Sequence, residues 1–197
     1  DRLRSRGLGD VYKRQSKSMV LMQYSREHPD AQMAAQILAL EETAWPSDGE
    51  NAPFPSAPET YVTSFVLLDE GRAICHVGIR NSSLSHKGQT YLAYGLSEVV
   101  THPRHQNQGL GSKMLKVARQ FILDHRPDIS VFTCAPERVS FYTHGGWQAV
   151  PGACFVGGTA EKPFRSDTLG LITMMMFCSA KAKQHKSAFE NLSLIHI

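Results

Sequence analysis

The sequence lacks a long apolar segment: no stretch approaches the roughly 20 apolar residues that a membrane-spanning helix needs. The first residues are charged and no long apolar run follows them, so no secretory signal peptide is visible. Neither sign of charge is in large excess, with 21 Lys and Arg against 18 Asp and Glu. The formal net charge is +3 over 197 residues, without a run of basic residues interleaved with aromatics. We therefore expect a cytoplasmic protein that binds neither membranes nor nucleic acid.

Patterns of metal ligands are missing as well. The nine histidines form no His-Glu-x-x-His motif, and the four cysteines have no metal-like spacing. The four cysteines are Cys75, Cys134, Cys154 and Cys178, and most of them sit in apolar, strand-like runs. Buried free thiols in a reducing compartment fit this distribution, and we predict no metal site.

The length suits one domain with a full core, which we expect to span residues 18–182. Residues 1–17 have neither a helical nor a strand period, and we expect them to be a non-native or disordered leader. Residues 183–197 are expected to be a tail whose last residues are non-native. Both ends are typical of adapter sequence joined to a metagenomic fragment. The basic stretch at 181–186 is expected to be solvated.

Hydrophobic periods and turn residues predict alternating strands and helices. The predicted strands are residues 18–24, 61–68, 73–82, 91–101, 128–134, 147–156 and 169–178. The predicted helices begin near Asp30, at Leu110 and at Pro136. Short turns join the second, third and fourth strands, which predicts an antiparallel meander. The helix between the fourth and fifth strands predicts a right-handed parallel crossover.

The most informative stretch is Gln106–Ser112, Gln-Asn-Gln-Gly-Leu-Gly-Ser, between the fourth strand and the helix that begins at Leu110. Gly109 and Gly111 have no Cβ, so a bulky anion can approach the backbone there. The first amides of a helix have no intrahelical partner and carry the positive end of its dipole. The loop therefore suits a phosphate or pyrophosphate, although its spacing is neither Gly-x-Gly-x-x-Gly nor a P-loop. The alternative is an ordinary tight turn.

Together with Phe141–Trp147, Phe-Tyr-Thr-His-Gly-Gly-Trp, this loop resembles the GNAT family of acyl-CoA N-acyltransferases. That family's pyrophosphate loop reads Gln/Arg-x-x-Gly-x-Gly/Ala, and a later helix commonly ends in Tyr followed by Gly and an aromatic. The resemblance extends over about Tyr61–Trp147. It implies an α/β (α+β) fold, the GNAT fold. In that fold a mixed sheet of about six to seven strands, flanked by about four helices, is splayed between strands 4 and 5.

The resemblance also implies acetyl-CoA as co-substrate and no metal. Its pyrophosphate would bind the amides of Gln106, Asn107, Gln108, Gly109, Leu110, Gly111 and Ser112. Its pantetheine would pair with the backbone of Val99, Val100 and Thr101 as if it were another strand. The sequence departs from the common family pattern in three places, one of which is the pair Asn107 and Gln108, where a Gly-Lys type pair is commoner. Gln106 stands where many members have Arg, and Ala135 stands where many have an Asn that contacts the cofactor.

Two residues are the predicted catalytic groups. Tyr142 matches the family's general acid, whose hydroxyl reaches the leaving sulfur; its alternative role is packing. Glu98 is the candidate general base, directly or through water, and otherwise an exposed or paired strand residue. His76, His102 and His105 are weaker alternatives for the base.

The predicted reaction is transfer of an acetyl group to a primary amine of a small molecule, by direct attack in a ternary complex. The segment after Phe141 is also similar to aminoglycoside 2'-N-acetyltransferases. Such a polycationic acceptor needs several carboxylates, for which Glu98, Glu161 and Asp167 are candidates in a slightly basic chain. A non-catalytic CoA-binding module is another alternative, in which the hydroxyl of Tyr142 has no use. A homodimer is left open.

Overall fold

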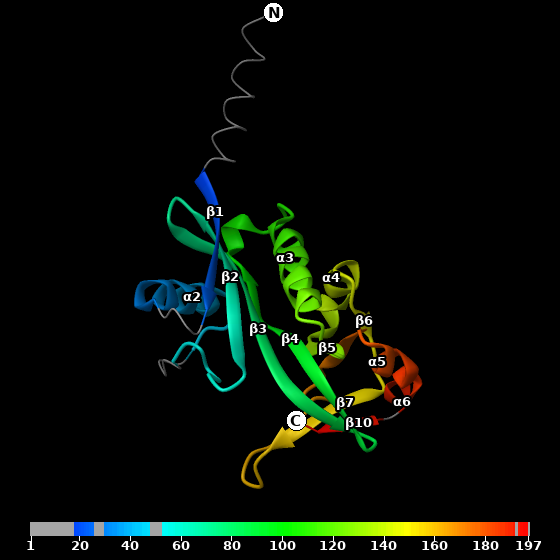
Figure 1. Cartoon of the computed structure of the whole chain (residues 1–197). Helices are drawn as coiled ribbons and strands as arrows, with labels where there is room; N and C mark the ends of the chain where they lie inside the picture. Colours follow the sequence, from blue (N-terminus) through cyan, green and yellow to red (C-terminus); the bar gives the residue numbers. More distant parts are fainter. Residues whose placement is uncertain (1–17, 26–29, 48–52, 192, 197) are drawn as a thin grey trace, which may run out of the picture.

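The computed structural model describes residues 18–25, 30–47, 53–191 and 193–196. Within them the chain forms one curled sheet with helices on its two faces (Figure 1). The first elements are β1 (Met19–Ser25), α2 (Ala31–Ala44), β2 (Tyr61–Asp69), β3 (Arg72–His86) and β4 (Gln89–Thr101). The crossover contains η1 (Pro103–His105), α3 (Leu110–Asp124) and β5 (Ile129–Cys134), followed by η2 (Pro136–Arg138) and α4 (Val139–His144). The last elements are β6 (Gln148–Ala149), β7 (Ala153–Gly158), β8 (Pro163–Arg165), β9 (Ile172–Phe177), α5 (Ala180–Gln184), α6 (Lys186–Glu190) and β10 (Ser193–His196).

The sheet confirms the predicted class and topology. Strands β1 to β4 pair antiparallel in sequence order, and β4 pairs parallel with β5 after the α3 crossover. The sheet continues on one side as β5-β9-β6 and on the other as β3-β10-β7-β8. The ten strands of the described residues exceed the six to seven expected. None of the described helices is both long and apolar enough to cross a membrane.

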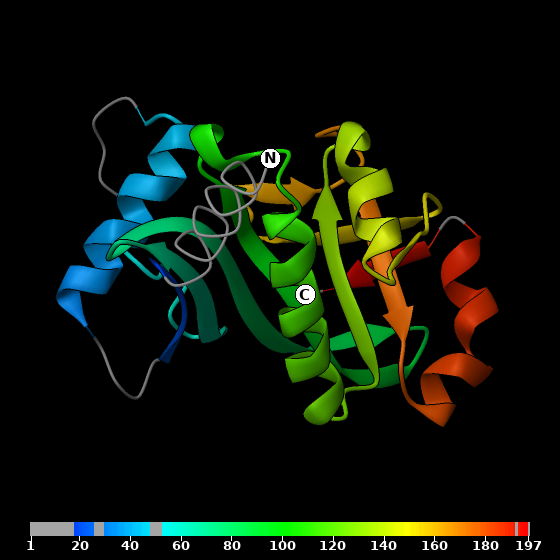
Figure 2. The ribbon, with the colours of Figure 1, turned by 90° about the horizontal axis from the view of Figure 1, so that it is seen from above.

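Two helices cover opposite faces of the sheet because neighbouring strand residues point to opposite sides. Phe65 packs in the core cluster that contains the apolar stripe of α3, whereas the next residue, Val66, packs in the cluster of α2. The Asp30 carboxylate caps α2 by accepting bonds from the amides of Gln32 (2.9 Å) and Met33 (3.2 Å). Figure 2 shows helix α2 at one end of the molecule and the C-terminal helices α5 and α6 at the other.

The C-terminal part differs from the sequence expectation. The predicted strand at 147–156 is split into β6 and β7, because Pro151 lies between them and has no amide to donate to a ladder. Three exposed or half-buried residues form β8 inside the predicted linker. Residues 180–190 form α5 and α6, and residues 193–196 form β10, which pairs parallel with β7 and antiparallel with β3.

The predicted splay lies at the middle of the sheet. β4 pairs with β5 only at Ala93↔Ile129 and Tyr94↔Ser130, although both strands continue for several residues. On its other edge, β4 carries a bulge opposite β3, where the register shifts between His76 and Gly78. Glu98 lies in this bulge with a left-handed φ of 54°, which non-glycine residues rarely adopt. The bulge therefore stands beside the point where β4 leaves β5.

Candidate active site

The loop before α3 has free backbone amides. Asn107 and Gly109 both have positive φ, 61° and 76°, so the chain turns tightly into the helix. Among the described residues, no hydrogen bond is donated by the backbone amides of residues 107–112. The side chain of Gln106 folds back on the loop, since its side-chain Nε2 donates to the Thr101 carbonyl at 3.2 Å. A group of unpaired amides at a helix start is the arrangement that binds an anion.

The two glycines of the loop have different roles. A Cβ added to Gly109 would meet no protein atom within 4 Å, so its surroundings are open and its positive φ is the constraint. A Cβ added to Gly111 would lie 3.1 Å from the Phe141 ring. Gly109 therefore opens the loop to a ligand, and Gly111 lets the start of α3 pack against α4.

Two neighbouring cavities lie along the splay. The smaller, of about 520 Å³, is lined by every predicted cofactor-binding residue except Gln108. The larger, of about 930 Å³, is lined by both predicted catalytic residues, Tyr142 and Glu98. Trp45, Val99 and Arg138 line both cavities, so the two cavities adjoin one another at these residues.

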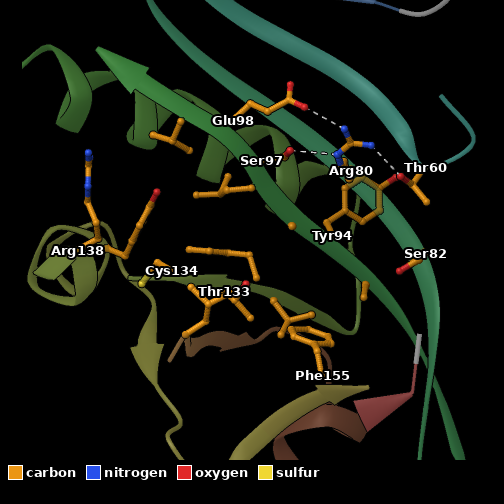
Figure 3. Close-up of a pocket in the computed structure, with 18 of the residues that line it drawn as sticks. Thr60, Arg80, Ser82, Tyr94, Ser97, Glu98, Thr133, Cys134, Arg138 and Phe155 are labelled. Atoms are coloured by element: carbon orange, nitrogen blue, oxygen red, sulfur yellow. Dashed lines mark hydrogen bonds and ion pairs between the residues drawn. The ribbon is translucent and has the colours of Figure 1, made fainter. Parts of the chain in front are cut away.

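The larger cavity passes through the gap between β4 and β5. In Figure 3, Glu98 and Arg80 lie on one side of the cavity, Cys134 and Arg138 lie on the other, and Phe155 lies at the far end. Ala135, at the position where many GNAT members have Asn, also lines this cavity. The cavity is therefore lined on one side by the bulge of β4 and on the other by β5 and the start of η2.

Tyr142 is held in α4 with its ring buried against Phe132, at a centroid distance of 4.7 Å. Its hydroxyl makes no hydrogen bond within the described residues, and the side chain lines the larger cavity. Burial raises the pKa of Tyr142 to about 12, while the Arg138 guanidinium acts in the opposite direction. The phenol is therefore protonated at neutral pH, which is the state that can donate a proton.

Glu98 is oriented by Arg80. Glu98 Oε1 accepts a bond from Arg80 Nη2 at 3.1 Å and another from Ser56 Oγ at 3.2 Å. The other guanidinium nitrogens donate to Ser97 Oγ (3.0 Å), the Ala57 carbonyl (2.8 Å) and Thr60 Oγ1 (3.0 Å). Arg80 thus ties the loop before β2 to the bulge and directs the Glu98 carboxylate (Figure 3).

His76 supports the bulge and is not a free base. Its side chain is fully buried, and Nδ1 lies 2.7 Å from the Glu98 carbonyl oxygen, to which it donates. Its Nε2 lies 2.7 Å from Ser64 Oγ. Burial lowers the pKa of His76, so the ring is neutral at neutral pH. Among the other candidate histidines, His102 caps η1 through Nδ1, and His105 lines the smaller cavity.

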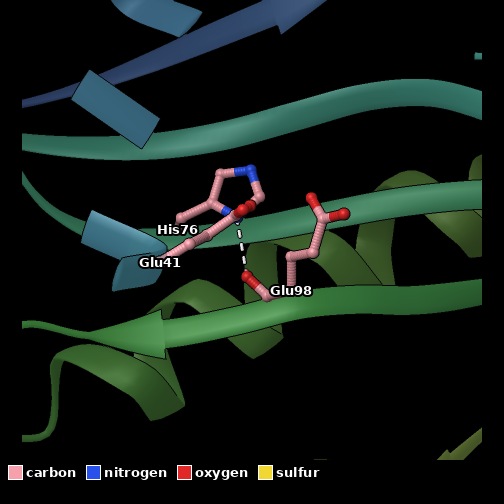
Figure 4. A group of neighbouring side chains, drawn as sticks. All are labelled: Glu41, His76 and Glu98. Carbon is pink, nitrogen blue, oxygen red and sulfur yellow. Dashed lines mark hydrogen bonds between the residues drawn. The ribbon is translucent and has the colours of Figure 1, made fainter. Parts of the chain in front are cut away.

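Glu41 of α2 also belongs to this cluster. The carboxyl oxygens of Glu41 and Glu98 and a ring nitrogen of His76 lie within 4.8 Å of one another (Figure 4). Glu41 Oε1 is buried and makes no hydrogen bond of normal length among the described residues. Burial, followed by the neighbouring Glu98 carboxyl, raises the pKa of Glu41 to about 8.

These three residue types can bind metals, but the arrangement fits proton sharing better. Both His76 nitrogens are already hydrogen-bonded, which leaves no ring nitrogen for a cation. Glu98 Oε1 is already bonded to Arg80. The carboxyl of Glu41 is protonated at neutral pH, so it can donate a proton beside the bulge.

Comparison with known proteins identifies the family. The model of an acetyltransferase (GNAT) domain matches residues 29–150, which is more than half of the chain. The chain belongs to the GNAT acetyltransferase family. The matched domain is an acetyltransferase domain, and two of the similar solved structures contain acetyl-CoA or CoA. The open amides at the start of α3 and the adjoining cavities fit that group. No curated protein sequence matches the chain.

Solved structures agree on the fold. YhbS from Escherichia coli, in complex with CoA, has a TM-score of 0.62 at 14% identity, covering 91% of this chain and 89% of that chain. ElaA from Escherichia coli has a TM-score of 0.59 at 11% identity, with 80% and 98% covered. A GNAT family acetyltransferase from Brucella melitensis, in complex with acetyl-CoA, has a TM-score of 0.50 at 18% identity, with 66% and 84% covered. At these identities the likeness shows the fold alone.

Four side chains at the site escaped the sequence analysis: Glu41, Trp45, Arg80 and Arg138. A signal existed for Glu41, because it follows Ile37 by four residues and so borders the apolar stripe of α2. A signal also existed for Arg80, a charged residue inside a predicted strand. Trp45 and Arg138 lie at helix boundaries, where periodicity carries no information about neighbours.

Proposed function

We propose that the protein transfers the acetyl group of acetyl-CoA to a primary amine of a small molecule, by direct attack in a ternary complex. The observation that carries this proposal is that the two cavities adjoin at Trp45, Val99 and Arg138, which line both of them. An acyl donor anchored at the α3 loop would extend past these residues into the larger cavity. That cavity is large enough to hold an acceptor beside the reacting end of the acyl donor.

The acyl donor would be held by the chain at two places. The free amides of residues 107–112 bind the pyrophosphate at the positive end of the α3 dipole. Residues Val99, Val100 and Thr101, which line the smaller cavity, offer the β4 edge to the pantetheine amides. Acetyl-CoA supplies the acetyl group as an activated thioester.

The side chains of the larger cavity supply the two proton transfers. The acceptor nitrogen forms a bond to the carbonyl carbon, and the carbon–sulfur bond breaks. Glu98 takes the proton that the nitrogen loses, directly or through water, with Arg80 keeping the carboxylate in place. Tyr142 gives its hydroxyl proton to the departing sulfur. A backbone amide of Val99 or Val100 stabilises negative charge on the carbonyl oxygen.

Charge in the site favours an ordinary amine over a polycation. Of the three carboxylates proposed for an aminoglycoside, Glu98 is paired with Arg80. Asp167 is paired with Arg165 at 2.8 Å, and Glu161 is exposed on the turn between β7 and β8. Neither Glu161 nor Asp167 lines the larger cavity. These observations give no support to an aminoglycoside acceptor.

A thiol assay tests the proposal. Purified protein is mixed with acetyl-CoA and a panel of primary amines, and released CoA is measured against a sample without amine. We expect amine-dependent CoA release, and saturating acetyl-CoA should raise the melting temperature, since a ligand far above its dissociation constant stabilises the native state by a few kcal/mol. Thermal stabilisation without CoA release for any amine would contradict catalysis. Absence of both would contradict the acyl-donor assignment itself.

A further inference from the structure

We propose that the acceptor is a primary amine carried on an apolar body of about aromatic size, which occupies the far end of the larger cavity. This inference rests on the proposed function and names the substrate class for it. Six apolar side chains of the cavity lining are relevant, and five of them, including Phe155, which lies at the far end in Figure 3, pack in or against one core cluster; the six are Leu84, Ala93, Val131, Phe155, Phe164 and Leu171. We call these six residues the apolar end.

The apolar end lies on the sheet face opposite α3. Arg80 and Ser82 pair across the strands with Gly95 and Ala93, so the side chains of these β3 and β4 residues share one face. The core cluster on this face contains Leu84, Ala93, Val131 and Phe155, with Phe164 packed against it, and includes no residue of α3. The α3 stripe packs instead with Tyr94 and Leu96 on the other face. The acyl donor and the apolar end therefore approach the gap from opposite sides.

Charge and polarity change along this half of the cavity. Near the bulge, Glu98 and Arg80 form an ion pair, with Thr60, Ser82 and Ser97 beside them. Beyond them, toward Phe155, the described lining residues carry no charged side chain. A second ammonium group would lose its water there without gaining a counter-charge. An apolar body would gain by leaving water, so the cavity selects an amine with a single polar end.

A long acyl chain is the other occupant of matching chemistry. We favour the acceptor because the acyl donor would enter past Trp45, Val99 and Arg138, on the side of the α3 loop. An acyl chain reaching the apolar end would pass Glu98 and occupy the position from which the amine must attack. The two occupants make different predictions, because chain-length preference belongs to the acyl donor and ring preference to the acceptor.

The first experiment compares kcat/KM for 2-phenylethylamine, ethanolamine and spermidine at saturating acetyl-CoA. We expect 2-phenylethylamine to exceed ethanolamine by at least about tenfold, the discrimination typical of an apolar pocket. Spermidine should be no better than ethanolamine. Equal values for all three amines, or a preference for spermidine, would overturn the inference while leaving the proposed function intact. Octanoyl-CoA that outperforms acetyl-CoA would assign the apolar end to the acyl chain and also overturn it.

The second experiment uses Phe164→Ser, with Leu169→Ser as the matched control. Phe164 is half-buried in β8 and lines the cavity, whereas Leu169 is 60% exposed and does not. We expect Phe164→Ser to raise the KM for 2-phenylethylamine about tenfold, with the KM values for ethanolamine and acetyl-CoA unchanged. Leu169→Ser should change none of the three.

Equal effects of Phe164→Ser on both amines would overturn the inference. If this variant does not fold, as judged by thermal denaturation, Leu171→Ser tests the same surface, since Leu171 lines the cavity directly before β9. If no amine releases CoA from the unaltered protein, the proposed function fails and the substrate class fails with it.

Discussion

Glu41 makes stability depend on pH, and Glu41→Gln should remove that dependence. Burial and the Glu98 carboxyl raise the pKa of Glu41 to about 8, from 4.5 in the unfolded chain. Between these pH values the folded state keeps a proton that the unfolded state has released. The free energy of unfolding therefore falls as pH rises from about 4.5 to about 8 and stays at its lower value above that.

The size of the effect follows from the shift. One pKa unit corresponds to about 1.4 kcal/mol, so a shift from 4.5 to about 8 has an upper bound of about 5 kcal/mol. Glu41 keeps some contact with solvent and shares its field with Glu98, so we expect about 2 kcal/mol. Glutamine has the same shape and no charge, so Glu41→Gln should be close to wild type at pH 5 and about 2 kcal/mol more stable at pH 9.

Urea denaturation at pH 5, 7 and 9 measures this difference directly. Glu59→Gln is the control, since Glu59 is also a glutamate but is exposed. Parallel pH profiles for wild type and Glu41→Gln would show that the carboxyl of Glu41 is ionised in the folded protein at neutral pH. That result would refute the account of the cluster at the bulge.

Three further predictions concern the acyl donor and the acid. Tyr142→Phe should lower kcat about 100-fold without changing the dissociation constant of CoA measured by calorimetry; unchanged kcat would exclude Tyr142 as the acid. Gly109→Val, with its Cβ at a positive φ in the anion loop, should weaken CoA binding at least about 100-fold; wild-type affinity would contradict the assignment of that loop. Arg138→Gln should weaken CoA binding about tenfold through loss of a bond to a phosphate, and adding Gln106→Arg should restore part of the affinity. Pantetheine has no phosphates, so equal losses of affinity for CoA and for pantetheine would place Arg138 away from the phosphates.

Local features of the fold could be predicted because their signals lie in neighbouring residues. Asp30 before an apolar helical period marks the start of α2, and the two glycines before Leu110 mark the start of α3. The parallel crossover followed from the order strand, helix, strand. The splay and the role of the bulge came from the family resemblance, since no residue pattern states where two strands separate.

Contacts between distant segments could not be predicted. The approach of Glu41 to Glu98 depends on how α2 lies across β3 and β4, and helical periodicity fixes only which face is apolar. The five bonds of Arg80 join β3, β4 and the loop before β2, which only the folded sheet brings together. Strand β8 has three residues, too few to show a period. In β10 burial alternates, but the exposed Leu194 is as apolar as the buried Ile195, so the sequence shows no alternation.

The separation of β4 from β5 also creates a hazard for the protein. Past Tyr94, one edge of β4 is not paired with β5, as at the border of a sheet, and residues 95–99 line the larger cavity. Unpaired strand edges recruit other chains and promote aggregation. A bound pantetheine arm would cover this edge, so the cell's CoA pool would protect the enzyme against self-association as well as supplying its reaction. Light scattering from concentrated protein should accordingly grow more slowly with CoA present than without it.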